Sequence, residues 1–256
     1  MKRWWVALVL AACMLGWSAT GVGGGFLEAV NGLPCVIDYV SGMWPPDLRI
    51  LPSLVSPLIE TIQMGFLGVI MASVISAPLS FLAARETSLC NVTYILSKLI
   101  INVCRSIPTL LWAILFVTMV GLGPSAGVFA LTVHCVGALG KYFHEGIESI
   151  YPRVRDMLDA MEVDGASRTM AFILGLVPAV SPLFLSYIIY YMEWSVRVGT
   201  ILGLVGAGGL GLRLTMSIRM FRRQETCTII LAIFVMVMII DALSRAARKS
   251  LLQETL

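Results

Sequence analysis

A few ionisable side chains lie within otherwise apolar runs of this sequence, and they are the first candidates for chemistry. His134 falls midway through such a run, where an imidazole is costly unless it has a polar partner or lines a polar cavity. Glu193 and Arg197 are four residues apart, the spacing at which opposite charges meet on one helix face. These residues predict a polar pathway or gate, and a purely structural role in packing or pairing stays open for each.

A glycine-dense stretch at residues 199–211 follows Arg197. Gly206, Gly208 and Gly209 permit unusual backbone angles and close helix approach, and their amides can offer hydrogen bonds to an anion. The stretch is too short and too breakable for an ordinary membrane span, so we interpret it as a re-entrant or interfacial segment. Packing and gating are favoured over anion binding.

Motifs for enzymatic chemistry are missing from the sequence. It has no H-E-x-x-H pair, no G-x-S-x-G elbow and no G-x-x-x-x-G-K-[ST] phosphate loop, so we expect neither an enzyme nor ATPase activity in this chain alone. Its six cysteines show no C-x-x-C spacing, and no metal site is expected. Cys13 ends a lipoprotein-like LAAC, but the apolar run continues past it, which favours an uncleaved first span.

Composition places these residues in a membrane. Hydrophobic residues make up 58% of the chain, charged residues only 13%, and the mean hydropathy is +0.90. Since a spanning helix needs about 20 residues, the 256 residues predict an all-α polytopic membrane protein with about six transmembrane helices and no large soluble domain. The net charge of +3 and the basic residues near the membrane edges indicate no nucleic-acid partner.

The hydropathy pattern divides the chain into a first span with an external loop, residues 1–56, and a transmembrane domain, residues 57–250. Both termini are expected in the cytoplasm, and 12 of the 18 basic residues then lie inside. Five of the other six follow the fifth span, which fits the positive-inside rule poorly. The expected spans are 4–20, 57–84, 105–121, 125–142, 170–192 and 225–243.

The long cytoplasmic loop at residues 145–178 carries the most informative motif. Its end, DAMEVDGASRTMAFILGLVP, resembles the E-A-A-x3-G-x9-I-x-L-P loop of permeases of binding-protein-dependent ABC importers, with Gly175 in place of the isoleucine. A glycine permits a sharp bend between two short helices that can seat on a partner protein. The residues that match the family's ATPase-coupling motif are Asp159, Ala160, Met161, Gly165 and Pro178.

Three further stretches look like phosphonate/phosphite-type importer permeases: GLGPSAGVFALTVH, LGKYFHEGIESI and SVRVGTILGLVGAGGLG. This resemblance implies the type I ABC importer permease architecture with a cytoplasmic coupling helix, in a bacterial inner membrane. It implies import of a phosphonate, phosphite or phosphate. It also implies a separate ABC ATPase subunit that binds ATP and Mg, a periplasmic phosphonate-type substrate-binding protein and a second copy of the permease.

An ion-coupled secondary transporter of a small anion is the alternative. Such a protein needs acidic or broken-helix ion sites near the midplane and usually has inverted repeats, and the sequence suggests neither.

Overall fold

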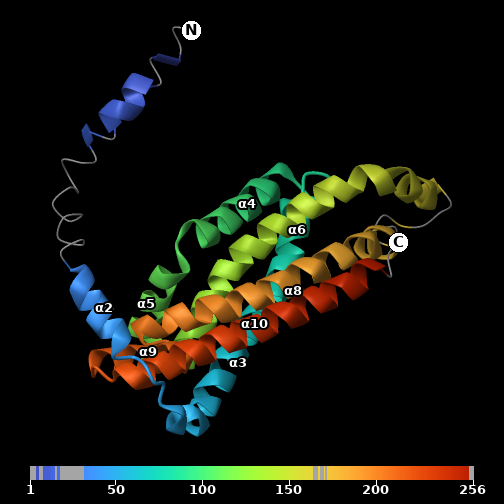
Figure 1. Cartoon of the computed structure of the whole chain (residues 1–256). Coiled ribbons are helices and arrows are strands. Elements are labelled where there is room, and N and C mark those ends of the chain that lie inside the picture. The colour runs from blue at the N-terminus through green and yellow to red at the C-terminus, as the bar shows by residue number, and fades with distance from the viewer. Residues whose placement is uncertain are drawn as a thin grey trace.

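In a computed structural model of the chain, apolar helices form an elongated bundle, which confirms the all-α polytopic prediction (Figure 1). The structure describes residues 4–5, 8–14, 16–17, 32–163, 167, 170 and 172–253. Four helical stretches in this part of the chain are long and apolar enough to cross a membrane: Leu48–Ala83, Pro124–Met161, Phe172–Val205 and Arg223–Lys249. Only part of the expected first span, 4–20, falls within the described residues.

A bent pair of helices supplies a fifth crossing if it is counted as one span. α4 (Asn91–Ser106) and α5 (Thr109–Val120) meet at 87°. Alone, the 12 residues of α5 extend only about 18 Å, less than the hydrocarbon thickness of about 30 Å. The sharp bend falls just before Pro108, where a proline disfavours helical backbone at the preceding residue.

α6 (Pro124–Val163) continues as one helix of 40 residues past the expected end of the fourth span at residue 142. The predicted cytoplasmic loop at 145–178 is therefore helical as far as residue 163. An apolar stripe explains the extension, because Ile147, Tyr151, Val154 and Leu158 recur at helical spacing and pack in one cluster with Leu176 and Val180. The charged residues between them occupy the other faces.

The helix of the expected fifth span, 170–192, also extends past its expected end. A π-helix (Phe172–Leu176) leads into α8 (Val177–Leu202), which extends well beyond Glu193. A single 3-10 turn (Gly203–Val205) and a tight glycine turn then separate α8 from α9 (Gly209–Arg219). The glycine-dense stretch is therefore a helix break, followed by α10 (Arg223–Gln253), the last helix.

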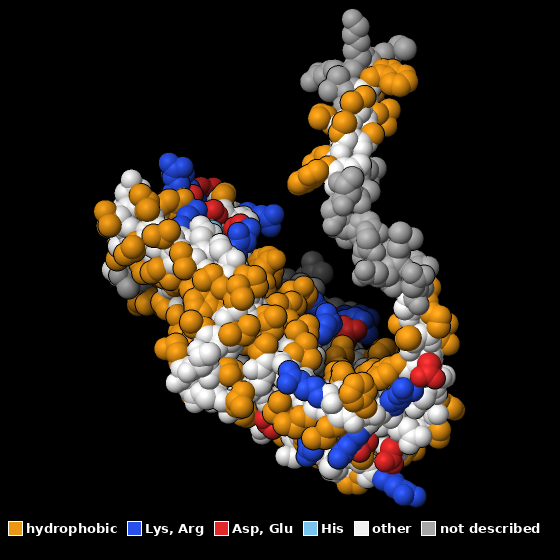
Figure 2. Space-filling model, turned by 90° about the vertical axis from the view of Figure 1, so that its left-hand side faces the viewer, with side chains coloured by type: hydrophobic (Ala, Val, Ile, Leu, Met, Phe, Trp, Pro, Cys, Tyr) orange, Lys and Arg blue, Asp and Glu red, His pale blue; other side chains and the backbone are white. Residues whose placement is uncertain are grey.

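The long helix α3 (Leu51–Ala83) packs against α6, α8 and α9, and this packing fixes their relative depths. Near the middle of α3, Gly65 leaves no room for a Cβ beside Val196 of α8, and its carbonyl accepts a hydrogen bond from the Ser195 hydroxyl at 3.0 Å. Outside the bundle, α2 (Leu33–Ser41) and a 3-10 turn (Leu48–Ile50) precede α3. Figure 2 shows hydrophobic side chains over the middle of one face and charged side chains towards its ends.

Candidate transport site and coupling surface

A buried carboxylate joins two arginines between α8 and α10. Glu193 has a side chain only 9% exposed, and its Oε1 accepts a hydrogen bond from Arg197 Nη2 at 2.8 Å. Its Oε2 accepts one from Arg248 Nη2 at 3.4 Å. A carboxylate that is removed from water is stabilised by such charge-assisted hydrogen bonds. The three groups together carry one net positive charge.

The depth of this cluster differs from the prediction. Because Glu193 and Arg197 directly follow the expected span 170–192, the predicted topology places them at its outer end. Arg248 follows the span 225–243 and would lie at its cytoplasmic end. Since Ser195 bonds to Gly65 near the middle of the 33-residue α3, the cluster instead lies near the middle of the bundle. Ionisable groups at such depth usually face the protein interior or a water-filled cavity.

His134 lies in the first half of α6, as the sequence predicts for a mid-span residue. Its ring stacks on Trp194 of α8, with 5.2 Å between ring centroids and 17° between ring planes. Its Nδ1 is buried and has no hydrogen-bond partner among the described residues. Ring stacking gives His134 a packing contact, while the unpartnered nitrogen leaves a polar atom free for another group.

The glycine turn before α9 docks on α3. Gly206, Gly208 and Gly209 have φ values of 92°, 83° and 66°, which side chains rarely adopt. The Gly209 N–H donates to Glu60 Oε1 at 3.1 Å, and the neighbouring Thr61 hydroxyl accepts from the backbone of α9 in the same way. The chain's own carboxylate thus occupies the electropositive start of α9, which supports the packing interpretation of these glycines.

Sequence reasoning missed Glu60 and Thr61. The available signal was an acid inside the apolar run of residues 57–84, because an unpartnered carboxylate is unfavourable there. Their partners lie 149 residues further along the chain, and no local pattern connects the two segments.

The arginines that fitted the positive-inside rule poorly have specific partners. Arg223 pairs with Asp38 of α2 at 3.2 Å, and Arg222 pairs with Glu225 at 3.2 Å. Together with Arg197, three of these five arginines form ion pairs, so a carboxylate partially compensates the charge of each.

The residues predicted to contact an ATPase lie at the far end of α6 and the start of α8. Asp159 and Ala160 are exposed, and Asp159 pairs with Arg155 at 3.7 Å. Met161 packs partly into the cluster that holds Leu158, and Pro178 occupies the first turn of α8. The predicted bend residue, Gly165, lies outside the described residues.

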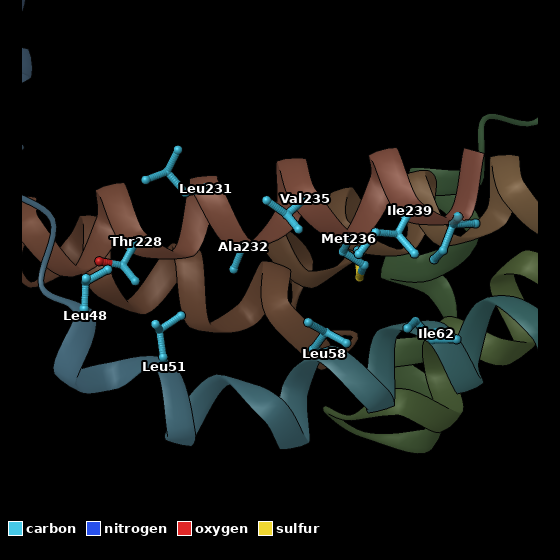
Figure 3. A pocket seen from close by; sticks show the side chains of 11 residues that line it. Leu48, Leu51, Leu58, Ile62, Thr228, Leu231, Ala232, Val235, Met236 and Ile239 are labelled. Atoms are coloured by element: carbon cyan, nitrogen blue, oxygen red, sulfur yellow. The ribbon is translucent and has the colours of Figure 1, made fainter. Parts of the chain in front are cut away.

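A separate apolar groove of about 420 Å³ runs between α3 and α10 (Figure 3). Thr228 is the one lining residue with a hydroxyl, and this hydroxyl donates to the Asp47 carbonyl at 2.9 Å. The groove offers no charge to an anion, so the polar cluster between α8 and α10 is the better candidate for a transport site. The remaining lining residues are Leu48, Leu51, Leu58, Ile62, Leu231, Ala232, Val235, Met236, Ile239 and Ile240.

Apolar helices of membrane-spanning length, a polar cluster between two of them and an exposed end of α6 are features compatible with a membrane transport subunit. The family described as "Binding-protein-dependent transport system inner membrane component" matches residues 76–254. The chain belongs to this family and is a multi-pass inner-membrane protein.

Named relatives carry the same kind of description. The putative phosphite transport system permease protein HtxC of Stutzerimonas stutzeri is 39% identical over 223 residues, covering 87% of this chain and 78% of that protein. The phosphite transport system permease protein PtxC of the same organism is 35% identical, covering 96% and 90%. The phosphate-import permease protein PhnE of Mycolicibacterium smegmatis is 32% identical, covering 87% and 41%.

Solved structures share the fold. An inward-facing MetNI methionine ABC transporter chain has a TM-score of 0.67 at 22% identity, covering 80% of this chain and 99% of that one. A chain of an amino acid ABC transporter has a TM-score of 0.65 at 19% identity, covering 79% and 96%. These similarities confirm the predicted ABC importer permease architecture.

Proposed function

We propose that this chain is the permease subunit of an ATP-driven bacterial importer for a phosphorus oxyanion: phosphite, a phosphonate or phosphate. The names of its relatives support this substrate class, since two are phosphite and one is phosphate permeases. The net positive charge of the buried Glu193 cluster is compatible with an anionic substrate.

The continuity of α6 carries the proposed mechanism. His134 lies on this helix within the bundle, and Asp159 lies on the same helix 25 residues later, about 38 Å along the axis. Because α6 is continuous, a movement of its exposed end at Asp159 also moves His134, which stacks on Trp194 of α8. The ATPase contact consists of Asp159, Ala160, Met161, Gly165 and Pro178, within the coupling region 145–178.

The partners follow from this role. A separate ABC ATPase subunit binds ATP and Mg and hydrolyses the nucleotide, while this chain is not an enzyme. A periplasmic substrate-binding protein delivers the oxyanion, and a second copy of the permease completes the pathway.

In the proposed division, residues 1–56 form the first transmembrane helix and external loop, and residues 57–250 form the transport domain. His134, Glu193, Arg197 and the turn at 206–209 form the pathway or gate.

Uptake by a reconstituted complex tests this function. The permease, its ATPase and its binding protein are placed in proteoliposomes, and accumulation of labelled phosphite, methylphosphonate, phosphate and sulfate is followed with and without ATP. We expect ATP-dependent accumulation of at least one phosphorus oxyanion and none of sulfate. Accumulation that follows an imposed proton or sodium gradient without ATP would instead support the secondary-transporter alternative.

A further inference from the structure

One face of α8 concentrates polar aromatic and charged side chains. The five residues follow one another at intervals of one or three residues, which places them all on the same broad side of the helix: Tyr187, Tyr190, Tyr191, Trp194 and Arg197. Hydroxyls and a guanidinium gathered on one side contrast with the exposed leucines, isoleucines and valines of α3 and α10. We refer to these five residues as the α8 polar face.

Two flanks bound the α8 polar face. On the α6 side, Tyr142 lies 5.2 Å from Tyr187 and 5.9 Å from Tyr191 between ring centroids, and Trp194 continues this contact to His134. On the α10 side, the Arg248 guanidinium lies 5.7 Å from the Tyr190 ring and also bonds to Glu193. Tyr190 and Arg197 therefore form a middle strip. The ring contacts with α6 flank this strip on one side, and Arg248 flanks it on the other.

This middle strip is open. The Tyr190 residue is 42% exposed and the Arg197 side chain 50% exposed, although both lie near the depth of Gly65, in the middle of α3. A guanidinium facing hydrocarbon at this depth is costly, so the strip requires water or a polar partner. The Glu193 carboxylate takes one hydrogen bond from each arginine, while each guanidinium has five N–H donors.

We propose that Tyr190, Arg197 and Arg248 form a water-exposed oxyanion-binding surface, on which the guanidinium forks and the tyrosine hydroxyl hold the phosphoryl oxygens of the transported anion. Guanidinium matches the geometry of phosphoryl groups, and a phenol adds a neutral donor. Glu193 orients both arginines and lowers the total charge, which favours weak binding and release. This inference rests on the proposed function for its substrate class, but its exposure to water is independent of transport.

Access to water is tested first by thiol labelling. In a reconstituted complex whose six native cysteines are replaced by alanine or serine, Tyr190→Cys is compared with Ile239→Cys, a 55% exposed residue of the apolar α3–α10 groove. A negatively charged, membrane-impermeant thiosulfonate reagent is expected to modify the first variant at least tenfold faster. Equal, slow modification of both would place the strip against lipid or a second protein surface and overturn the proposal.

Binding is tested by protection. Phosphite, phosphate or methylphosphonate at millimolar concentration is expected to slow labelling of an Ile201→Cys variant, while sulfate has less effect. Ile201 is 49% exposed and lies one helical turn beyond Arg197, so this variant keeps all three proposed ligands. Fast labelling that none of the three anions slows would overturn the proposed oxyanion binding, although the surface would still be accessible to water. Protection without ATP-driven uptake would instead contradict the proposed function and leave the surface intact.

Transport kinetics supply a second measurement. Tyr190→Phe and Arg248→Lys each remove hydrogen-bond donors to a charged group, so the KM for uptake is expected to rise about tenfold, with a smaller change in kcat. Matched controls are Tyr94→Phe, which removes the hydroxyl that accepts a hydrogen bond from Lys98 in α4, and Arg222→Lys, in the ion pair with Glu225. An unchanged KM in both test variants would contradict a role in binding.

Discussion

Arg248 Nη2 lies 3.4 Å from Glu193 Oε2, although the two residues are 55 positions apart and were expected at opposite ends of their spans. The contact joins α8 to α10 near the middle of the bundle. With Arg197 on the other oxygen, it makes Glu193 the centre of a buried ion-pair cluster.

The first prediction concerns the stability of this cluster. Glu193→Gln leaves two guanidiniums without their counterion, and because the Arg197 side chain is half-exposed, we expect a loss of about 1 to 3 kcal/mol in unfolding free energy. Thermal unfolding in detergent measures it. Glu225→Gln is the control, because its pair with Arg222 is more exposed and is expected to contribute at most about 1 kcal/mol. Equal losses in the two variants would contradict the buried role of Glu193.

The second prediction concerns the docked turn. Gly209→Ala forces a side chain onto a backbone with φ of 66° beside Thr61, and we expect it to cost about 1 to 3 kcal/mol or more. Gly121→Ala is the matched control, since its φ is 97° but no atom lies within 4 Å of the added Cβ. If the midpoint of thermal unfolding falls further for Gly209→Ala than for Gly121→Ala, the difference reports the contact of the turn with α3. Equal shifts would indicate backbone strain alone.

The third prediction tests topology with two exposed thiols outside the spans. Cys90, which precedes α4, is expected to react with an impermeant maleimide only from the cytoplasmic side, and Cys35 of α2 only from the periplasmic side. Single-cysteine variants in right-side-out and inverted vesicles measure this. Reporter fusions at both termini should place both in the cytoplasm. Labelling of both thiols from one side would contradict the topology.

The pH dependence of Cys90 labelling follows from its environment. The backbone amide of Thr93, and then its hydroxyl, hold the pKa of the Cys90 thiol below its ordinary value. Since the thiolate is the reactive form, fast labelling should persist to lower pH than in a Thr93→Ala variant, which loses the hydroxyl. Superimposable pH profiles would show that the hydroxyl contributes nothing.

The fourth prediction separates two roles for His134. His134→Phe retains a ring to stack on Trp194 but removes both nitrogens, whereas His134→Leu removes the ring as well. If the nitrogens serve the pathway, both variants should lose most uptake while assembly and ATP binding persist. Uptake at the wild-type rate in His134→Phe would show that the residue only packs.

Hydropathy was sufficient to predict the helical membrane fold. In a bilayer, a long apolar run must satisfy its backbone hydrogen bonds within itself, and it does so by forming a helix. Helix ends were harder to place. α8 continues through Gly199, where the absent side chain lets α8 lie close to Met64 and Thr61 of α3. A glycine-dense sequence suggested a break before this point, but tertiary packing decides where the helix ends.

The candidate site was only partly predictable. The i, i+4 spacing identified the pair of Glu193 and Arg197, while its third member, Arg248, was assigned to the membrane edge because basic residues commonly lie there. Glu60 and the tyrosines of α8 received no role, since only the fold brings Glu60 to the start of α9 and Tyr190 to Arg248.

The last prediction concerns the proposed coupling loop, and it tests the central claim that a separate ATPase drives this chain through that loop. Gly165→Glu places a charged side chain at the predicted bend between Asp159 and Pro178, and the spans should still insert because they lie outside it. The control, Thr93→Glu, adds the same charge at the start of α4, between the expected spans 57–84 and 105–121, in a second segment that the topology places in the cytoplasm.

Transport-stimulated ATP hydrolysis in the reconstituted complex, with co-purification of the ATPase, is the direct measurement. For Gly165→Glu we expect at least a tenfold loss of stimulated hydrolysis or loss of the ATPase, with normal membrane insertion, while Thr93→Glu keeps both. Normal assembly and normal stimulated hydrolysis in Gly165→Glu would contradict the coupling role of this loop.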